Sequence, residues 1–506
     1  MSILTTLQLI PLLGSVVLMV LPKENAKIAK QVALFTSLVV VALALYMWSQ
    51  FDSSSGALQF VEVRHWIAAF GINYAVGADG MALVLILMTV VLVPIVIVAG
   101  WNESEGGRWS AKTFYILMMI LETMMIGVFA ATDVFLFYII FEAMLLPVYF
   151  LSGGYGRGER AAAALKFLMY SLFGGLLMLA AVIGTYIIST NQLGAGTFDL
   201  ARLSTLTIDG PTQNWLFLGF FIAFAIKAPL WPFHTWLPSA AKAATPGTSI
   251  LLLGVLDKVG TYGMIRFCMQ LFPDATKTFT PYIIALAVIS ILYGAFLAIG
   301  QKDINSLIAF TSISHFGFIT LGIFAMTSQG LSGAILYMVN HGVSTAALFM
   351  TAGWMVARRK SSQIADFGGL QRVTPVLAWS FFIAGLSALA LPGLSSFVSE
   401  FLVLLGSFAK YPVAAIFGTT GIVLAALYVL LVVQRSLHGE TKAGNEGMSD
   451  LNLREKIAVA PVIALLVVFG FFPKPLIDAI NPTSTTVMQH AGITDPAPTA
   501  TGKAGK

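Results

Sequence analysis

Apolar segments long enough to cross a bilayer recur along almost the whole 506-residue chain. A window of about 20 residues, the length that a helix needs to span the hydrocarbon core, finds about fourteen of them. Their expected limits are 3–21, 29–49, 79–100, 111–131, 132–152, 163–188, 213–233, 247–271, 280–300, 304–325, 331–357, 374–408, 411–434 and 456–473. Hydrophobic residues make up 58% of the chain and charged residues 10%, which excludes a soluble globule. Because a helix satisfies its own backbone in lipid, we predict an all-α polytopic membrane protein.

The Lys and Arg residues between these segments test the count independently. If the connections alternate between two faces, one face receives most of the cations: Lys23, Lys27, Lys30, Arg108, Lys112, Arg157, Arg160, Lys166, Lys242, Lys302, Arg358, Arg359, Lys360, Arg372, Arg435, Lys442, Arg454 and Lys456. The loops of the other face receive Arg64, Arg202, Lys277 and Lys410, with Arg266 near a helix end and three lysines in the tail. A missing or extra span would scramble this asymmetry. By the positive-inside rule, we expect both termini on the outer side of the membrane.

Two of the segments contain residues that break helices. Pro229 and Pro232 lie inside the seventh segment, and Pro392 with Gly393 divides the twelfth. Proline removes a backbone donor and clashes with the preceding turn, so we expect both helices to be interrupted. Each break falls in the fourth member of a five-helix unit, and an odd number of helices makes the second unit an inverted copy of the first.

The breaks therefore divide the chain into four expected parts. A three-helix segment covers 1–110, and two inverted five-helix repeats cover 111–271 and 272–437. Residues 438–506 would hold a C-terminal helix and a polar tail. From about 474 on, Pro, Thr, Ala, Gly and Lys dominate, which predicts that the tail is disordered or peripheral.

Ionisable residues near the middle of the apolar segments are the candidates for function. Seven of them are Glu122, Glu142, Lys227, Lys258, His315, His341 and Glu400, and His234 lies in the first break. Glu142 is about ten residues into its segment, which at 1.5 Å per residue is about half of a 30 Å core. A charge in hydrocarbon costs several kcal/mol, so a whole set at matched depth indicates a proton or ion path. The alternative for each residue is a hydrogen bond or ion pair that locks two helices together.

The chemistry of a buried lysine suits protons. Removal from water lowers the pKa of a lysine and a nearby glutamate raises it, so Glu142 would load and unload Lys227 as it approaches and leaves. Moving one charge across 100 mV takes about 2.3 kcal/mol, and one pKa unit is worth about 1.36 kcal/mol. Work against roughly 150 mV therefore needs a pKa swing of about two to three units, which documented buried lysines reach.

Other motifs argue against cofactors in this chain. The loop from Gly154 to Gly158, with the sequence GYGRG, resembles a phosphate-binding loop. It lacks the last glycine of the dinucleotide pattern and joins two membrane helices, which argues against a nucleotide site. The single cysteine, Cys268, excludes a cluster held by cysteines of this chain alone. No two of the six histidines have the spacing of metal ligands on a helix.

Five stretches together resemble the antiporter-like membrane subunits of respiratory complex I. They are FLFYIIFEAMLLPVYF (135–150), KAPLWPFHTWLP (227–238), LDKVGTYG (256–263), IAFTSISHFG (308–317) and HGVSTAALF (341–349), within a resemblance that runs over 1–473. The resemblance implies two inverted repeats with a proton half-channel from each side. It also implies residue roles: Glu142 and Lys227 as a coupled pair, Lys258 as the connecting lysine, His315 and His341 as a bridge, Glu400 in the second half-channel, and Glu122 at an often acidic position.

The same resemblance implies partners and a location. Flavin, iron–sulfur clusters and quinone would belong to other subunits, subunits L and N would be neighbours, and the membrane would be a bacterial inner membrane. A length near 500 and Glu400 distinguish the chain from those two subunits, which usually carry lysine at that place. One departure is clear, because Ser239-Ala-Ala241 stands where the family usually has Asp-Ala-His.

Two other functions remain open at this stage. The large subunits of multi-subunit cation/proton antiporters share these motifs, and only the length and Glu400 separate them from the complex I subunits. The third possibility is a structural membrane subunit whose polar core is inert.

Overall fold

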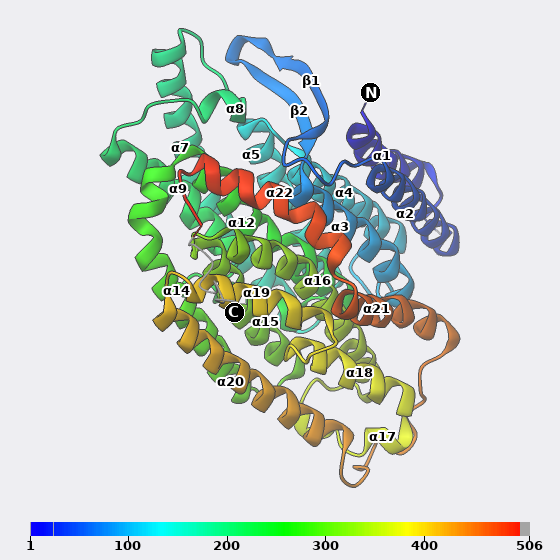
Figure 1. The fold of residues 1–506 in the computed structure, drawn as a ribbon. Coiled ribbons are helices and arrows are strands. Elements are labelled where there is room, and N and C mark those ends of the chain that lie inside the picture. Colours follow the sequence, from blue (N-terminus) through cyan, green and yellow to red (C-terminus); the bar gives the residue numbers. More distant parts are fainter. Residues whose placement is uncertain (1, 24, 496–506) are drawn as a thin grey trace.

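The computed structural model describes residues 2–23 and 25–495. The chain folds into one body of closely packed helices (Figure 1). Within those residues, eleven helices are long and apolar enough to cross a membrane, or twelve if the bent pair formed by α21 (Leu453–Phe471) and α22 (Lys474–His490) is one span. The protein is therefore a polytopic membrane protein, as predicted.

The remaining helices follow the predicted segments closely. In the N-terminal half they are α1 (Ile3–Val20), α2 (Ala26–Ser49), α3 (Gly80–Ala99), α4 (Ala111–Ala130), α5 (Val134–Ala143), α6 (Leu145–Tyr155), α7 (Arg160–Leu193), α8 (Leu200–Leu203), α9 (Gly210–Lys227), α10 (Trp236–Ala243), α11 (Pro246–Leu251), α12 (Lys258–Gly263) and α13 (Met269–Leu271). In the C-terminal half they are α14 (Pro273–Ile299), α15 (Ile304–Phe324), α16 (Ser328–Arg359), α17 (Leu370–Val373), α18 (Pro375–Ala388), α19 (Ser395–Phe408) and α20 (Pro412–Leu437).

The helices differ in how far the rest of the protein encloses them. The apolar windows of α16 and of the segment from Pro246 to Leu271 are 100% buried, and that of α15 is 94% buried. In α1, α2, α7, α14 and α20 the buried share is at most 44%, as expected for helices that face lipid. The most enclosed helices are thus the ones that carry Lys258, His315 and His341.

Both predicted helix interruptions are present. The first separates α9, which ends at Lys227, from α10, and the second separates α18 from α19. In the second break Gly393 has φ +93°, a left-handed conformation that glycine adopts without a steric penalty.

Three of the fourteen predicted spans, those of α9, of α18 with α19, and of α21, are not among the eleven helices because each lacks a long, uninterrupted apolar run. The polar start of α9 and the break after it shorten its apolar run, whereas α18 and α19 have only 14 residues each. The first turn of α21 holds three charged residues in succession, Arg454, Glu455 and Lys456.

The prediction of an all-helical chain missed one β-hairpin. Strands β1 (Gln59–Ile67) and β2 (Ile72–Ala78) pair antiparallel and extend from the edge of the helical body (Figure 1). A 3₁₀ turn and Gly71, at φ +64°, connect them. Glu62 holds the hairpin to the start of α1, because its Oε2 accepts hydrogen bonds from Thr5 Oγ1 at 2.6 Å and from the Ser2 amide at 2.7 Å. These donors lower the pKa of the Glu62 carboxyl to about 2.

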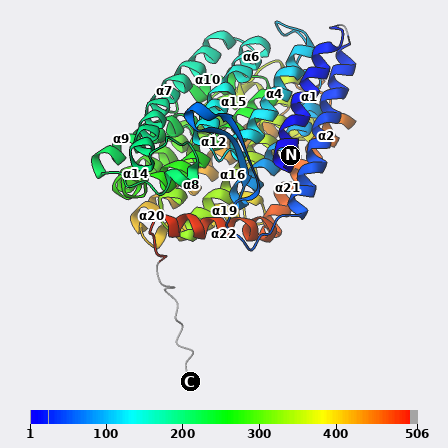
Figure 2. The ribbon, with the colours of Figure 1, turned by 90° about the horizontal axis from the view of Figure 1, so that it is seen from above.

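The part of the tail that the structure describes, residues 474–495, is peripheral and not disordered. Helix α22 lies across one end of the body, opposite the end where α6 and α10 lie (Figure 2). Its buried face includes Leu476, Ile480 and Val487, and Thr483 Oγ1 accepts a hydrogen bond from the Gly80 amide at 3.0 Å. The rest of the predicted tail, from residue 496 on, lies outside the described residues.

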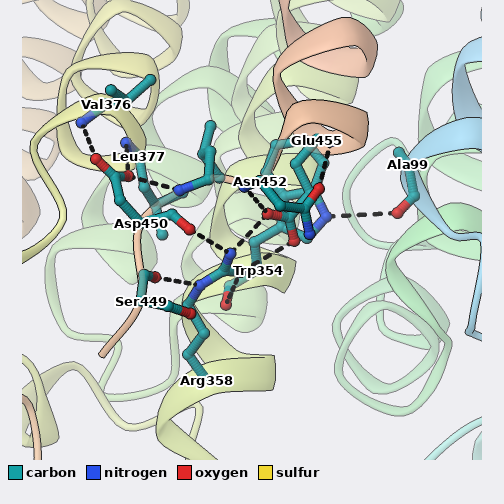
Figure 3. Close-up of polar contacts among 10 residues, drawn as sticks. Ala99, Trp354, Arg358, Val376, Leu377, Ser449, Asp450, Asn452 and Glu455 are labelled. Atoms are coloured by element: carbon teal, nitrogen blue, oxygen red, sulfur yellow. Dashed lines mark hydrogen bonds and ion pairs between the residues drawn. The ribbon is translucent and has the colours of Figure 1, made fainter. Parts of the chain in front are cut away.

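A polar cluster fixes the last turn of α16 against its neighbours (Figure 3). Arg358 forms a two-pronged ion pair with Glu455 of α21, with N···O distances of 2.6 and 3.2 Å, and donates to the Ser449 carbonyl at 2.7 Å. Asp450 accepts hydrogen bonds from the Val376 and Leu377 amides and so caps α18. Helices α16, α18 and α21 are therefore joined at one end by charge-assisted hydrogen bonds.

Candidate functional site

Lys258 occupies an irregular part of the most enclosed segment. The π-helical turn Leu252–Leu256 precedes it, and the Asp257 amide donates to the Leu252 carbonyl, five residues back, at 3.1 Å. The carbonyl of Leu253 accepts a hydrogen bond from Lys258 Nζ at 2.5 Å. π-turns inside helices are frequent at functional sites, and here the turn places a backbone acceptor beside a buried ammonium group.

Lys258 begins a line of polar side chains that come from four helices, α12, α16, α15 and α19. Its Nζ lies 2.7 Å from His341 Nδ1. The rings of His341 and His315 are 5.3 Å apart between centroids and perpendicular, and the His315 ring lies 5.7 Å from that of Tyr337. The Tyr337 hydroxyl donates to Glu400 Oε2 at 3.1 Å. The structure thus brings four of the predicted residues together, and Tyr337 joins His315 to Glu400.

The sequence explains this alignment in part. Tyr337 and His341 are four residues apart on α16 and therefore share one face of the helix. His315 comes from α15, and Glu400 lies in the second turn of α19, just after the second break.

Asn340 fixes the start of α19 relative to α16. Its Nδ2 donates to the Ser395 carbonyl at 2.6 Å and to Ser399 Oγ at 3.2 Å. Asn340 is fully buried. It therefore positions the helix that carries Glu400, and the sequence analysis did not single it out.

Glu142 and Lys227 form the second part of the site. Glu142 is near the end of α5 and Lys227 is the last residue of α9, fully buried at the first break. Lys227 Nζ lies 4.6 Å from the centroid of the Phe141 ring, which is a cation–π contact. Within the described residues, Glu142 Oε1 and Lys227 Nζ have no hydrogen-bond partner, so the two opposite charges attract without a direct ion pair.

Gly175 of α7 makes room for the carboxyl group of Glu142. A Cβ atom at this position would lie 1.8 Å from Glu142 Oε1 and 2.3 Å from its Cδ. Such distances are far shorter than van der Waals contact, so any larger residue would displace this carboxyl group.

Asp257 is a buried carboxylate that the sequence analysis overlooked. It is 0% exposed, interacts electrostatically with both Lys227 and Lys258, and neither of its carboxylate oxygens has a hydrogen-bond partner in the part of the chain that the structure describes. Its place in the middle of an apolar segment was the same signal that singled out Lys258. When it is ionised, Asp257 lies where its charge compensates the two lysines.

Two predicted residues lie apart from this line. Glu122 is fully buried on α4 and accepts a hydrogen bond from Ser37 of α2 at 3.1 Å, on the side of the N-terminal helices. His234 lies in the first break, 3% exposed, with its ring 5.0 Å from that of Tyr293. No hydrogen bond among the described residues links either of them to Lys258 or Glu400.

The arrangement offers groups that bind and release protons. Carboxyl, ammonium, imidazole and phenol groups follow one another in helices that exclude lipid, and each of them can donate or accept a proton. Over residues 2–23 and 25–495, no three His, Cys, Asp or Glu side chains are placed to hold a metal ion.

Comparison with known proteins agrees with the motifs. The family model described as NADH:quinone oxidoreductase/Mrp antiporter, TM, matches residues 131–425, and the chain belongs to this family. NADH-quinone oxidoreductase subunit M of Mycobacterium tuberculosis is 48% identical in an alignment of 528 residues that covers 98% of this chain and 95% of that protein. Subunit M of Rhodobacter capsulatus is 36% identical and covers 97% of each chain. Both relatives match nearly the full length of the chain.

Solved structures share the fold over the same extent. A chain of respiratory complex I from Thermus thermophilus, solved with bound NADH, has a TM-score of 0.88 and 30% identity over 97% of this chain and all of that chain. A chain of the Mrp complex from a Dietzia species has a TM-score of 0.84, with 20% identity over 97% of this chain, which shows a common fold only.

Proposed function

We propose that this chain is the proton-translocating subunit M of an NADH-quinone oxidoreductase. The observation that carries the proposal is the line of buried polar side chains from Lys258 to Glu400, of which all but Glu400 lie on the most enclosed helices. Intramembrane ionisable groups are expensive, so four at consecutive contacts are best explained by a transport path. The subunit M relatives support the assignment over the full length.

Each part of the site has a distinct role in this proposal. Glu142 and Lys227 take up a proton in the first half, and their separation without a direct ion pair leaves the lysine free to change its charge. Lys258 receives the proton, His341 and His315 pass it on, and Glu400 releases it through the second half. Asp257 compensates the lysines, and Tyr337 donates to the final carboxylate.

The architecture belongs to the same proposal. About fourteen crossings result if α9, the pair α18 and α19, and α21 each span the membrane beside the eleven longer helices. The two breaks favour inverted repeats over 111–271 and 272–437, flanked by 1–110 and 438–506. The cation distribution favours termini on the outer side of a bacterial inner membrane.

Electron transfer would take place in other subunits. Flavin, iron–sulfur clusters and quinone belong to those partners, and subunits L and N are the neighbours that we propose within the membrane. The runner-up function is a subunit of a cation/proton antiporter, which the fold of the Mrp chain supports.

The test is proton uptake by vesicles that contain the assembled complex during quinone reduction. We expect Glu142→Ala and Lys227→Ala to remove most of the uptake, because each change leaves the opposite charge buried without compensation. Glu440→Ala and Lys27→Ala are matched controls, since both side chains are exposed at the surface. Full uptake by the two site variants, with normal assembly, would exclude these residues from the mechanism.

A further inference from the structure

A cavity of about 1010 Å³ is lined in part by α10, which lies at the end of the body opposite α22 (Figure 2). Its lining comes from the loop before α7, from α10 and from the end of α16, and includes Arg157, Lys166, Lys242 and Lys360. Glu159 is the one acidic residue that lines it. Four cations against one carboxylate leave a positive potential in a partly enclosed space, which concentrates anions.

Among the residues that the structure describes, none of these four cations forms a direct ion pair, although Arg157 also interacts electrostatically with the buried carboxyl group of Glu103. The six ion pairs of the described residues involve other side chains. Lys166 donates to the Thr235 carbonyl at 2.7 Å, which holds its ammonium group at the cavity without cancelling its charge. Like charges that share a partly enclosed space repel one another, so an anion bound among them stabilises the protein.

Two further features supply hydrogen-bond donors. The 34-residue helix α7 begins at the cavity, its first turn has no side-chain cap, and Ala162 and Ala163 line the space. The Ala163 amide donates to the Glu159 carbonyl at 3.0 Å, so the amides left without a helical partner are those that precede it. The free amides at a helix start bind phosphate groups. Ser249, only 1% exposed, also lines the cavity, and its hydroxyl has no hydrogen-bond partner among the described residues.

The loop before α7 is held rigidly in place. The Arg157 amide donates to the Ala243 carbonyl at 2.6 Å, which ties the loop to the end of α10. A Cβ atom at Gly156 would lie 2.5 Å from the same carbonyl, so this close approach requires glycine. The site is therefore formed before any ligand binds.

We propose that this cavity binds a phosphate group, bridging α7, α10 and α16. Ser239, which replaces the aspartate usual in the family, also lines the cavity and so adds no negative charge to it. The phosphate can belong to an anionic phospholipid headgroup or be free inorganic phosphate, and an experiment with both probes distinguishes the two sources.

The experiment uses the intact purified complex. In the first arm, vesicles of phosphatidylcholine contain phosphatidylglycerol with a photoactivatable headgroup, and mass spectrometry locates the crosslinked peptides. In the second arm, the complex in detergent is equilibrated with radiolabelled inorganic phosphate. We expect label in residues 157–166 or 239–249, or phosphate retained by the complex, or both. Phosphate that displaces the lipid label identifies a site open to the free ion, and lipid label that resists phosphate identifies the headgroup.

The double variant Arg157→Gln/Lys242→Gln should bind the effective probe about thirtyfold more weakly, because each cation near a phosphate contributes about 1 kcal/mol and 1.4 kcal/mol is tenfold. Ser239→Asp should also weaken binding, although it removes no cation. Lys456→Gln, which removes an exposed cation outside the cavity, should bind as the unmodified protein does. Equal binding of both probes by the double variant and the unmodified complex, or binding of neither probe by the unmodified complex, would overturn the proposal.

Discussion

Replacing Gly175 by alanine changes no ionisable group, yet we expect it to stop most proton pumping. The new Cβ atom would lie 1.8 Å from Glu142 Oε1, and an ordinary contact needs more than 3 Å. The carboxyl group must therefore retreat by more than about 1 Å. Because a misplacement of this size costs about a hundredfold in reactions that depend on alignment, pumping should fall to the background of the assay.

The same substitution should leave the stability of the protein almost unchanged. Glu142 is a flexible side chain that can turn away, and alanine is favoured over glycine inside a helix by up to about 1 kcal/mol. The matched control is Gly153→Ala on α6, where the new Cβ would lie 3.4 Å from its nearest neighbour, the Cβ atom of Ala164. The control should pump normally.

The assay is proton uptake by vesicles that contain the assembled complex, together with NADH oxidation and the thermal unfolding temperature of the same preparation. Gly175→Ala that assembles, unfolds at the normal temperature and pumps fully would refute the argument that the position of Glu142 controls uptake.

Three further substitutions test other contacts. Tyr337→Phe removes the hydrogen-bond donor to the Glu400 carboxylate, so it should slow proton pumping while the complex still assembles. Full proton uptake by vesicles that contain this variant would show that the Tyr337 hydroxyl is not needed for proton transfer. Glu400→Gln should impair pumping because the residue can no longer change its charge, whereas Glu400→Lys should keep part of the pumping activity. Full activity of the glutamine variant would disprove the role of this carboxylate. Arg358→Ala leaves Glu455 buried without its ion-pair partner, which costs about 3–5 kcal/mol of folding free energy and should lower the thermal unfolding temperature. An unchanged unfolding temperature would contradict this expectation.

Local chemistry made the helices and their breaks predictable. A proline inside a helix leaves a backbone carbonyl without its hydrogen-bond donor, so the prolines at 229, 232 and 392 predicted both helix interruptions. The hairpin was harder, because β1 has exposed side chains on both of its faces and shows no clear alternation. Helix α22 was missed because Pro482 and several threonines concealed the periodic face of Leu476 and Ile480.

The site was predictable where it depends on charge and hidden where it depends on packing. Glu142, Lys227, Lys258 and Glu400 stood out because an ionisable group in an apolar segment is costly wherever it points. Tyr337 did not stand out, because a tyrosine in an apolar helix has the same appearance in a sequence whether it packs or donates. Only the contact between α16 and α19 shows that its hydroxyl reaches Glu400. The importance of Gly175 could not be predicted for the same reason, because it depends on its contact with the Glu142 side chain of another helix.

The most direct test of the central claim follows protons and sodium together. Vesicles that contain the purified complex receive NADH and a quinone, while internal pH and labelled sodium are recorded. The line of lysine, histidine and carboxyl groups offers proton acceptors but few of the hard oxygen ligands that sodium prefers. We expect proton uptake that depends on electron transfer, with no movement of sodium. Sodium that moves in fixed proportion to electrons, or exchange of sodium for protons without an electron donor, would contradict the account.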